Sequence, residues 1–326
     1  MRFQYTKGLH ELGNGCFAWL QPDGSWGWSN AGLISDSGES LLVDTLFDLR
    51  LTREMLAAMR AATPAAERID ALVNTHANGD HCYGNELVEG AVILASKACA
   101  EEMGQVTPQL MATLLRSADG MGEAGAFLRH AFGAFDFEGI RMVPATETFS
   151  GSLRRRVGDL EVDLLEVGPA HTRGDVIAHV PARRVVFTGD ILFVDGHPII
   201  WEGPIGNWIR ACDAICAMQP EVVVPGHGPL TDVAGVRRVR GYLEYILDAA
   251  RARYDAGLPA REAARDISLA DYAGWGDAER IAVNVSTLYR EFGDPSPPPG
   301  PLELFGWMAE LVRDRKGTPG VRPQAD

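Results

Sequence analysis

The chain has 326 residues and a formal net charge of -14, from 30 basic and 44 acidic residues. Hydrophobic residues make up 46% of it, which is enough apolar material for a large core and excludes a mainly disordered chain. The acidic balance argues against a nucleic-acid-binding groove, because phosphates demand Lys and Arg. The sequence also lacks the run of about 18 apolar residues that would predict a membrane span.

The five cysteines are scattered and odd in number, so they do not form the pattern of a disulfide framework. The opening segment has neither the apolar stretch nor the small-residue cleavage site of a signal peptide. We therefore expect a cytoplasmic protein, a monomer or homodimer, that acts on a small molecule. We expect no nucleic-acid partner and no membrane partner.

Short β-rich runs separated by turn residues occupy the first part of the chain. Leu51, Met55 and Met59 recur at helical spacing before a Thr-Pro breaker, which predicts a helix over 49–62. A polar loop is expected at 75–81, directly after a buried strand. The strands predicted in this part lie at 16–20, 31–35, 40–44, 69–74 and 91–95.

Residues 97–137 are helical in composition and rich in Met, Leu and Phe, and we interpret them as an inserted helical cap. β character returns over 141–167, where Gly158-Asp159 is a hairpin turn signal. Further strands are expected at 176–180, 185–188 and 222–224, and a helix at 209–218.

The last part of the chain is helical and amphipathic over 231–292, until a Pro-rich stretch at 294–301 stops regular structure. A short helix is expected at 302–313. We predict a main domain over 1–235 that contains the 97–137 cap, a helical extension over 236–313 packed on it, and a flexible tail at 314–326.

The most informative feature is the position of the histidines, because four of the eight directly follow predicted buried strands. Two aspartates occupy equivalent places. Since strand ends at one edge of a sheet converge in α/β proteins, we expect these side chains to share a site. Imidazole and carboxylate groups are ligands for Zn²⁺, Fe or Mn²⁺. The predicted metal ligands are His76, Asp80, His81, His171, Asp190 and His227.

Over roughly residues 10–235 the sequence resembles the metallo-β-lactamase superfamily. The resemblance is carried by THANGDH at 75–81, GPAHT at 168–172, FTGD at 187–190 and PGHG at 225–228. It implies an α/β fold of the αββα sandwich type, with two β-sheets face to face, helices outside and metals at one edge. It also implies two metal sites: His76, the residue at 78 and His171 in one, and Asp80, His81 and His227 in the other, with Asp190 bridging both.

One position departs from the superfamily loop His-x-His-x-Asp-His, because Asn78 stands where the second histidine is usual. An amide oxygen is a much weaker ligand than imidazole. Two interpretations stay open: Asn78 hydrogen-bonds within the loop, or it is a weak or water-bridged ligand. One consequence is a single tight zinc with a second, labile metal. The other is that His76, His171 and Asp190 act like a 2-His-1-carboxylate iron site.

The predicted function is that of a metal-dependent hydrolase, which uses metal-activated water on a small ester, lactone or thioester. Asp80 is the predicted catalytic residue, since its carboxylate can orient the nucleophile and pass a proton to the leaving group. The first alternative is an iron-dependent oxidoreductase or dioxygenase on the same scaffold. The second alternative is β-lactam hydrolysis.

Three residues after the Asp190 strand are candidates for the substrate pocket. His197 lies just past Asp190, and Trp201 and Asn207 belong to a segment that combines large aromatic residues with turn formers. For the tryptophans of this segment, packing against the cap and forming a pocket wall both stay open. An apolar cap would suit a hydrophobic acyl or aromatic substrate.

Overall fold

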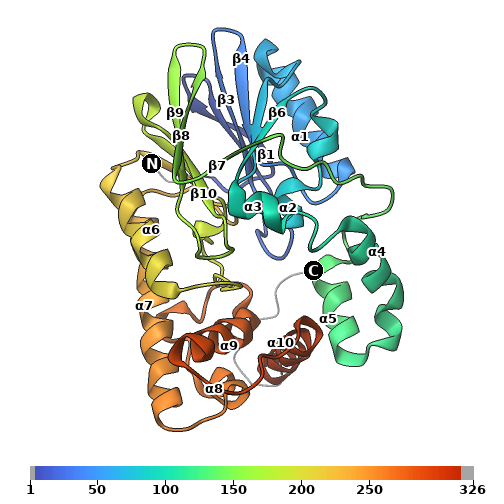
Figure 1. Cartoon of the computed structure of the whole chain (residues 1–326), viewed down its shortest axis with the longest axis vertical. Coiled ribbons are helices and arrows are strands. Elements are labelled where there is room, and N and C mark those ends of the chain that lie inside the picture. Colours follow the sequence, from blue (N-terminus) through green and yellow to red (C-terminus); the bar gives the residue numbers. More distant parts are fainter. Residues whose placement is uncertain (1–3, 317–326) are drawn as a thin grey trace.

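The structure is a computed structural model of the whole chain, and it describes residues 4–316. Two β-sheets lie face to face, and helices cover their outer faces and one end (Figure 1). The predicted αββα sandwich is therefore confirmed. Within the described residues, no helix is both long enough and apolar enough to cross a membrane.

The first sheet has seven strands in the order β1-β2-β3-β4-β5-β6-β7. Strands β1 to β4 pair antiparallel, and β4 to β7 pair parallel. The parallel pairs need crossover connections, and the first of these is the helix predicted over 49–62. The strands are β1 (Gly8–Gly13), β2 (Cys16–Leu20), β3 (Ala31–Asp36), β4 (Glu39–Val43), β5 (Ala71–Val73), β6 (Val92–Ser96) and β7 (Glu147–Phe149).

The second sheet has five strands in the order β12-β11-β10-β9-β8. Its inner face packs against the first sheet through fully buried aliphatic side chains. At Gly32 the sheets approach so closely that a Cβ atom would lie 2.1 Å from the ring of Phe187, so only glycine fits. The strands are β8 (Ser152–Val157), β9 (Leu160–Glu166), β10 (Val176–Val180), β11 (Val185–Phe187) and β12 (Val222–Val224).

Helix α1 (Leu49–Ala62) has the predicted bounds, because Asp48 caps its first turn through Leu51 N at 2.7 Å and Thr63-Pro64 ends it. The predicted cap consists of three helices. The other helices are α2 (Gly79–Cys82), α3 (Lys97–Glu102), α4 (Pro108–Ser117), α5 (Gly122–Phe132), α6 (Ile205–Ala217), α7 (Val233–Asp255), α8 (Ala260–Asp266), α9 (Ile281–Phe292) and α10 (Pro301–Lys316).

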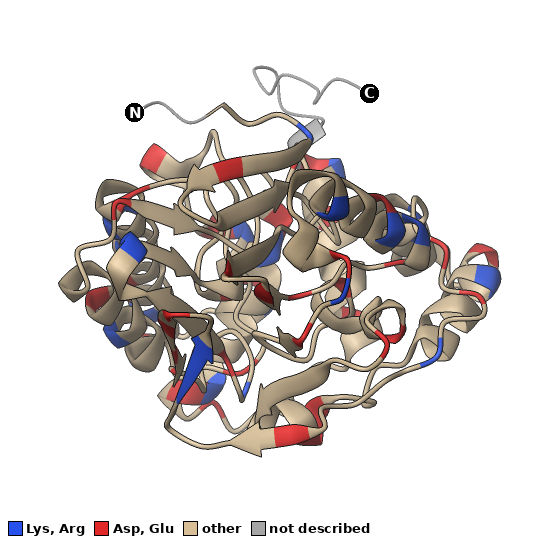
Figure 2. Cartoon of the chain, turned by 90° about the horizontal axis from the view of Figure 1, so that it is seen from above, with Lys and Arg blue, Asp and Glu red and all other residues tan. Residues whose placement is uncertain are grey.

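The predicted cap and the predicted extension meet, because α10 packs along α5 (Figure 1). Phe305 of α10 stacks on Phe127 of α5, with ring centroids 5.8 Å apart, and Arg313 pairs with Glu123. Figure 2 shows basic and acidic residues interspersed over the outer helices and turns. The domain boundaries proposed from the sequence stay a prediction.

Several local predictions were wrong. No strand was predicted over 8–13, because the half-buried edge strand β1 shows no clear hydrophobic alternation. The predicted β region begins at 141, but the segment before Glu147 is not a strand. Helix α6 begins at Ile205, after Pro204 as its N-cap, rather than at 209. The helical pattern over 231–292 is interrupted between α8 and α9. Of the tail predicted at 314–326, the helix α10 includes 314–316, and 317–326 lie outside the described residues.

Candidate metal centre

The six predicted ligands lie at one end of the sandwich, where strands of both sheets stop. His76 follows β5, and α2 then presents Asp80 and His81, so the predicted polar loop contains a short helix. His171 lies between β9 and β10, Asp190 follows β11, and His227 follows β12. The expected convergence of strand ends thus involves both sheets.

The ligands form two groups that come together through Asp190. His76, His171 and Asp190 form one group and Asp80, His81 and His227 the other, with one ligand atom of each residue within 4.8 Å of the others in its group. Asp190 also reaches into the second group: its Oδ1 is 3.1 Å from His81 Nε2, and its Oδ2 is 3.5 Å from His227 Nε2. A carboxylate in this position can serve two metals.

Each of the four histidines is held through Nδ1, which directs Nε2 toward the other ligands. Such partners set the tautomer and the ring orientation of a metal-binding imidazole. All four rings are buried. The Nδ1 contacts are Thr75 Oγ1 for His76 at 3.0 Å, Asp44 Oδ2 for His81 at 2.9 Å, the Ile199 carbonyl for His171 at 2.7 Å and the Gly24 carbonyl for His227 at 3.0 Å.

Asp44 organises the first-sheet side of the site from the end of β4. Its Oδ1 accepts from Thr75 N and its Oδ2 from Thr75 Oγ1, both at 2.7 Å, in addition to the contact with His81 Nδ1. Asp44 holds a left-handed φ of 62° and is buried. One strained, buried carboxylate therefore orients both histidines of the β5–α2 segment.

The unpaired atoms of this site fit a divalent cation. Within residues 4–316, His76 Nε2, His81 Nε2 and Asp190 Oδ1 are buried without a partner in hydrogen-bonding geometry. Burial alone would lower the pKa of His227, but the nearby Asp190 and Asp80 carboxylates raise it to about 9. The carboxylates thus favour a positive charge at this site. A divalent metal bound by the facing imidazole and carboxylate groups would supply that charge.

A family model described as the metallo-beta-lactamase superfamily matches residues 24–227, which is more than half of the chain. The chain belongs to the metallo-beta-lactamase superfamily. The resemblance inferred from the histidine motifs and the expectation of a superfamily enzyme are thereby confirmed.

The relatives of this superfamily member carry several different names. It is 26% identical over 230 residues to the acyl-coenzyme A thioesterase MBLAC2 of Homo sapiens, covering 66% of this chain and 79% of that protein. It is 23% identical over 231 residues to a linear primary-alkylsulfatase of Pseudomonas sp., covering 64% of this chain and 43% of that protein.

Among solved structures, the sec-alkylsulfatase Pisa1 from Pseudomonas sp. superposes with a TM-score of 0.65 at 16% identity, over 90% of this chain and 52% of that chain. This chain therefore spans about half the length of the two alkylsulfatases. A superposition over 90% of the chain cannot be reached without the C-terminal extension, so the likeness in fold includes helices outside the family-model match.

Asn78, where the superfamily loop usually has histidine, lies beside the first ligand group. It is the N-cap residue of α2, and its Nδ2 is 3.0 Å from His171 Nε2, the nitrogen that faces the ligands. A half-turn of the amide exchanges Nδ2 for Oδ1 at this place. Asn78 therefore contacts a residue of the first group, and its role as a weak ligand stays a prediction.

The three predicted pocket residues occupy different surroundings. Trp201 is half-buried, with its ring centroid 6.5 Å from that of Trp26. Asn207 lies on α6 and donates to the carbonyls of Val167 and Pro169 at 3.0 and 2.7 Å, so it supports the loop that carries His171. His197 is fully buried and packs against rings of the C-terminal extension.

Sequence reasoning missed the segment 21–28, which contacts the second ligand group at His227. Gly24 accepts from His227 through its carbonyl, and a side chain at Gly24 would meet the backbone of Gly228. The signal was the Asp23-Gly24 turn, but a turn signal does not say which distant residue the turn will touch.

Gly24→Ala is expected to weaken metal retention at the His227 group. Gly24 has a φ of +67°, and a Cβ atom there would lie 2.7 Å from Gly228 N, so the segment must move away from His227. Losing such a contact costs about 10–100-fold in metal affinity. Competition with a chelating dye measures this affinity. Gly38→Ala is the matched control, because Gly38 also has a positive φ but has open space around it; equal affinities in the two variants would contradict the role of Gly24.

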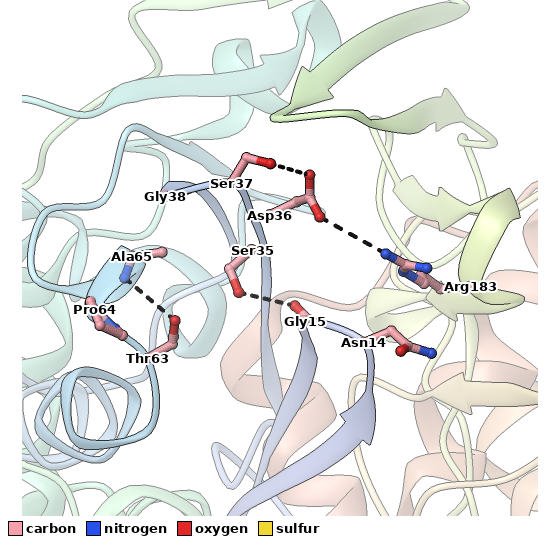
Figure 3. Close-up of a pocket in the computed structure, with 10 residues that line it drawn as sticks. All are labelled: Asn14, Gly15, Ser35, Asp36, Ser37, Gly38, Thr63, Pro64, Ala65 and Arg183. Carbon is pink, nitrogen blue, oxygen red and sulfur yellow. Dashed lines mark hydrogen bonds and ion pairs between the residues drawn. The ribbon is translucent and has the colours of Figure 1, made fainter.

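A cavity of about 500 Å³ lies away from the ligands, at the turns that close the opposite ends of the strands (Figure 3). Asp36 and Arg183 face each other across it at 3.9 Å, and Ser37 donates to Asp36 at 3.0 Å. None of the predicted ligands lines it. Its walls hold no pair of groups suited to metal-dependent hydrolysis.

Proposed function

We propose that this protein is a metal-dependent hydrolase of a small ester, lactone or thioester with an apolar acyl group. The observation that carries the proposal is the pair of His/Asp ligand groups brought together through Asp190 in a member of the metallo-beta-lactamase superfamily. The thioesterase name of MBLAC2, of which this chain covers 79%, favours thioesters among these substrates.

Zinc is the metal we propose, since both groups combine imidazole with carboxylate donors; iron and manganese accept the same donors. A metal held there supplies a Lewis acid and makes water nucleophilic near neutral pH. The chain itself fixes where the donors point, through the Nδ1 contacts of the four histidines. It also removes competing solvent, because all four rings are buried.

Asp80 is proposed to carry the proton to the leaving group. Its Oδ2 is 3.2 Å from His227 Nε2, and its side chain keeps 12% exposure, against 3% for Asp190. Burial would raise the pKa of Asp80, but His81 and His227 outweigh it and lower the pKa. Asp80 is therefore ionised and accepts a proton from the nucleophile before passing it on.

An aromatic cluster supports the apolar acyl group. Trp201 comes two residues after Ile199, whose carbonyl holds His171, and its ring lies beside that of Trp26. Trp26 in turn makes edge contacts with Phe127 and Phe132 of α5, with ring centroids 5.8 and 5.7 Å away. These rings connect the metal centre to the cap with apolar surface.

Longer acyl chains are expected to raise kcat/KM. Each methylene that becomes buried should lower the activation free energy by up to about 0.8 kcal/mol. The test uses acetyl to octanoyl coenzyme A thioesters and nitrophenyl esters, a lactone and a β-lactam with the zinc-loaded protein. Trp201→Ala should flatten the dependence on chain length. A β-lactam hydrolysed faster than every ester and thioester would overturn the proposal, as would a wild type without activity on any acyl substrate.

Hydrolysis of alkyl sulfate esters is a second candidate. It is favoured by the superposition with Pisa1, which includes the C-terminal extension. Release of sulfate from alkyl sulfates of the same chain lengths distinguishes it from acyl transfer to water.

The iron-dependent oxidoreductase is supported by the composition of the His76, His171 and Asp190 group alone. Predominant iron in the purified protein, together with oxygen consumption, would favour it.

A further inference from the structure

Two segments that are distant in sequence hold His227. The Gly24 carbonyl accepts from its Nδ1 at 3.0 Å. On the face of the imidazole, the Phe193 ring lies parallel at 5° with a centroid distance of 5.0 Å. Val194 N also donates to the His227 carbonyl at 2.9 Å. The position of His227 thus depends on segments 21–28 and 193–197.

Residues of the C-terminal extension fasten the first of these segments. Ser25 Oγ donates to Asp277 Oδ1 at 2.5 Å, and Trp26 Nε1 donates to Glu279 Oε1 at 2.9 Å. Glu279 is buried, and the side chain of Asp277 keeps only 9% exposure. Both acceptors are carboxyl groups largely shielded from solvent, where a hydrogen bond is costly to break.

Arg280 contacts both segment 21–28 and segment 193–197. Its guanidinium lies 4.5 Å from the Trp26 ring and 5.0 Å from the Phe193 ring. Nη1 donates to the His197 carbonyl at 2.9 Å, and Nη2 pairs with Asp277 at 3.0 Å. Arg280 keeps only 1% exposure. Because the buried guanidinium is rigid and planar and contacts both segments, it fixes the distance between them.

The backbone adds a further connection beside Arg280. Gly276 N donates to the Asp195 carbonyl and His197 N to the Gly276 carbonyl, both at 2.9 Å. Residues 276–280, directly before α9, are therefore attached to segment 193–197 by main chain and to segment 21–28 by side chains. The extension residues that make both attachments lie beyond the family-model match, which ends at residue 227.

We propose that Asp277, Glu279 and Arg280 form a positioning clamp, through which the C-terminal extension sets how firmly His227 and its ligand group retain metal. The clamp rests on the metal centre of the proposed function. It touches neither substrate nor metal. It keeps Gly24 and Phe193 against the imidazole, so that His227 is already oriented when the metal binds. Loosening the clamp frees the ring and speeds metal loss from the Asp80, His81 and His227 group.

The experiment measures zinc release from the full-length, zinc-loaded protein to an excess of a chelating dye. The first variant is the charge-neutral pair Arg280→Met with Asp277→Asn, which removes a buried ion pair as a unit and spares the fold an unpaired charge. The second is the near-isosteric Glu279→Gln. We expect the slow phase of release, from the His227 group, to become about tenfold faster, the low end for lost support of a ligand. The fast phase, from the His76 and His171 group, should not change.

Glu310→Gln is the matched control. Glu310 is a half-buried carboxylate of the same extension that pairs with Arg261 and Arg265, away from segment 21–28. Circular dichroism confirms that each variant is folded. An unchanged slow phase in a folded clamp variant overturns the proposal, and so does an equal acceleration in Glu310→Gln. A wild type that holds no metal would overturn the proposed function and the clamp together, whereas firm metal binding without any hydrolysis overturns the function alone.

Discussion

Asp190→Asn is expected to remove metal from both ligand groups and to lower kcat/KM at least about 10³-fold. Asp190 Oδ2 lies 3.3 Å from His171 Nε2 and 3.6 Å from His76 Nε2, and Oδ1 lies 3.1 Å from His81 Nε2. The amide keeps the size of the side chain but loses the charge shared between the groups. Metal content per chain after gel filtration and the steady-state rate on the best substrate measure the effect.

The control for this variant is Asp213→Asn, a change of the same chemistry at an exposed carboxylate that pairs with Arg240. Surface ion pairs of this kind contribute about 0–1 kcal/mol, so metal content and rate should match the wild type. If Asp190→Asn retained two metals per chain, the carboxylate would not be the link between the groups, and the centre would have to be assigned differently.

Asn78→His is expected to raise the metal content after mild chelation toward two per chain. The wild type should hold one metal firmly, in the group of Asp80, His81 and His227, and release a second one readily. Asn78 already lies 3.0 Å from His171 Nε2, at the edge of the weaker group. An imidazole there adds a third histidine to His76 and His171 and is a much stronger ligand than an amide.

The stoichiometry is measured in parallel for wild type, Asn78→His and Asn14→His. Asn14 lines the cavity at the opposite end of the strands, so an added histidine there tests for adventitious binding (Figure 3). A wild type that already keeps two metals as firmly as the Asn78 variant would show that Asn78 is an adequate ligand. The prediction of unequal sites would then be wrong.

Much of the metal centre was accessible from the sequence because its ligands occupy one kind of place. His76, Asp80 and His81 come within a few residues of one strand end, and His171, Asp190 and His227 each follow a strand end in the second sheet. Buried strands produce an apolar pattern, and a histidine or aspartate directly after such a strand stands out from it. Local spacing was sufficient to select all six candidate ligands that the structure brings together.

The pocket candidates show where this reasoning weakens. Trp201, His197 and Asn207 are near one another in sequence, yet their surroundings differ. Trp201 lies in an aromatic cluster, His197 packs against the extension, and Asn207 supports the His171 loop. Helix α6 begins at Ile205, which places Asn207 on a helix instead of the loop expected there. Proximity in sequence does not decide which face of an element a side chain will occupy.

Hydrophobic periodicity in the sequence determined the helix over 49–62, and motifs at strand ends determined the six candidate ligands, because both are local properties of the chain. The αββα class followed from the family resemblance that these motifs carry. Only the tertiary structure decided what supports those ligands. Two of the four Nδ1 contacts are made to backbone carbonyls, of Ile199 and Gly24, and every residue in the chain carries such a carbonyl. The packing of α5 on α10, and of residues 277–280 on segment 21–28, likewise joins parts of the chain whose sequences carry no mark of each other. Their contact depends on how the whole chain closes around its core.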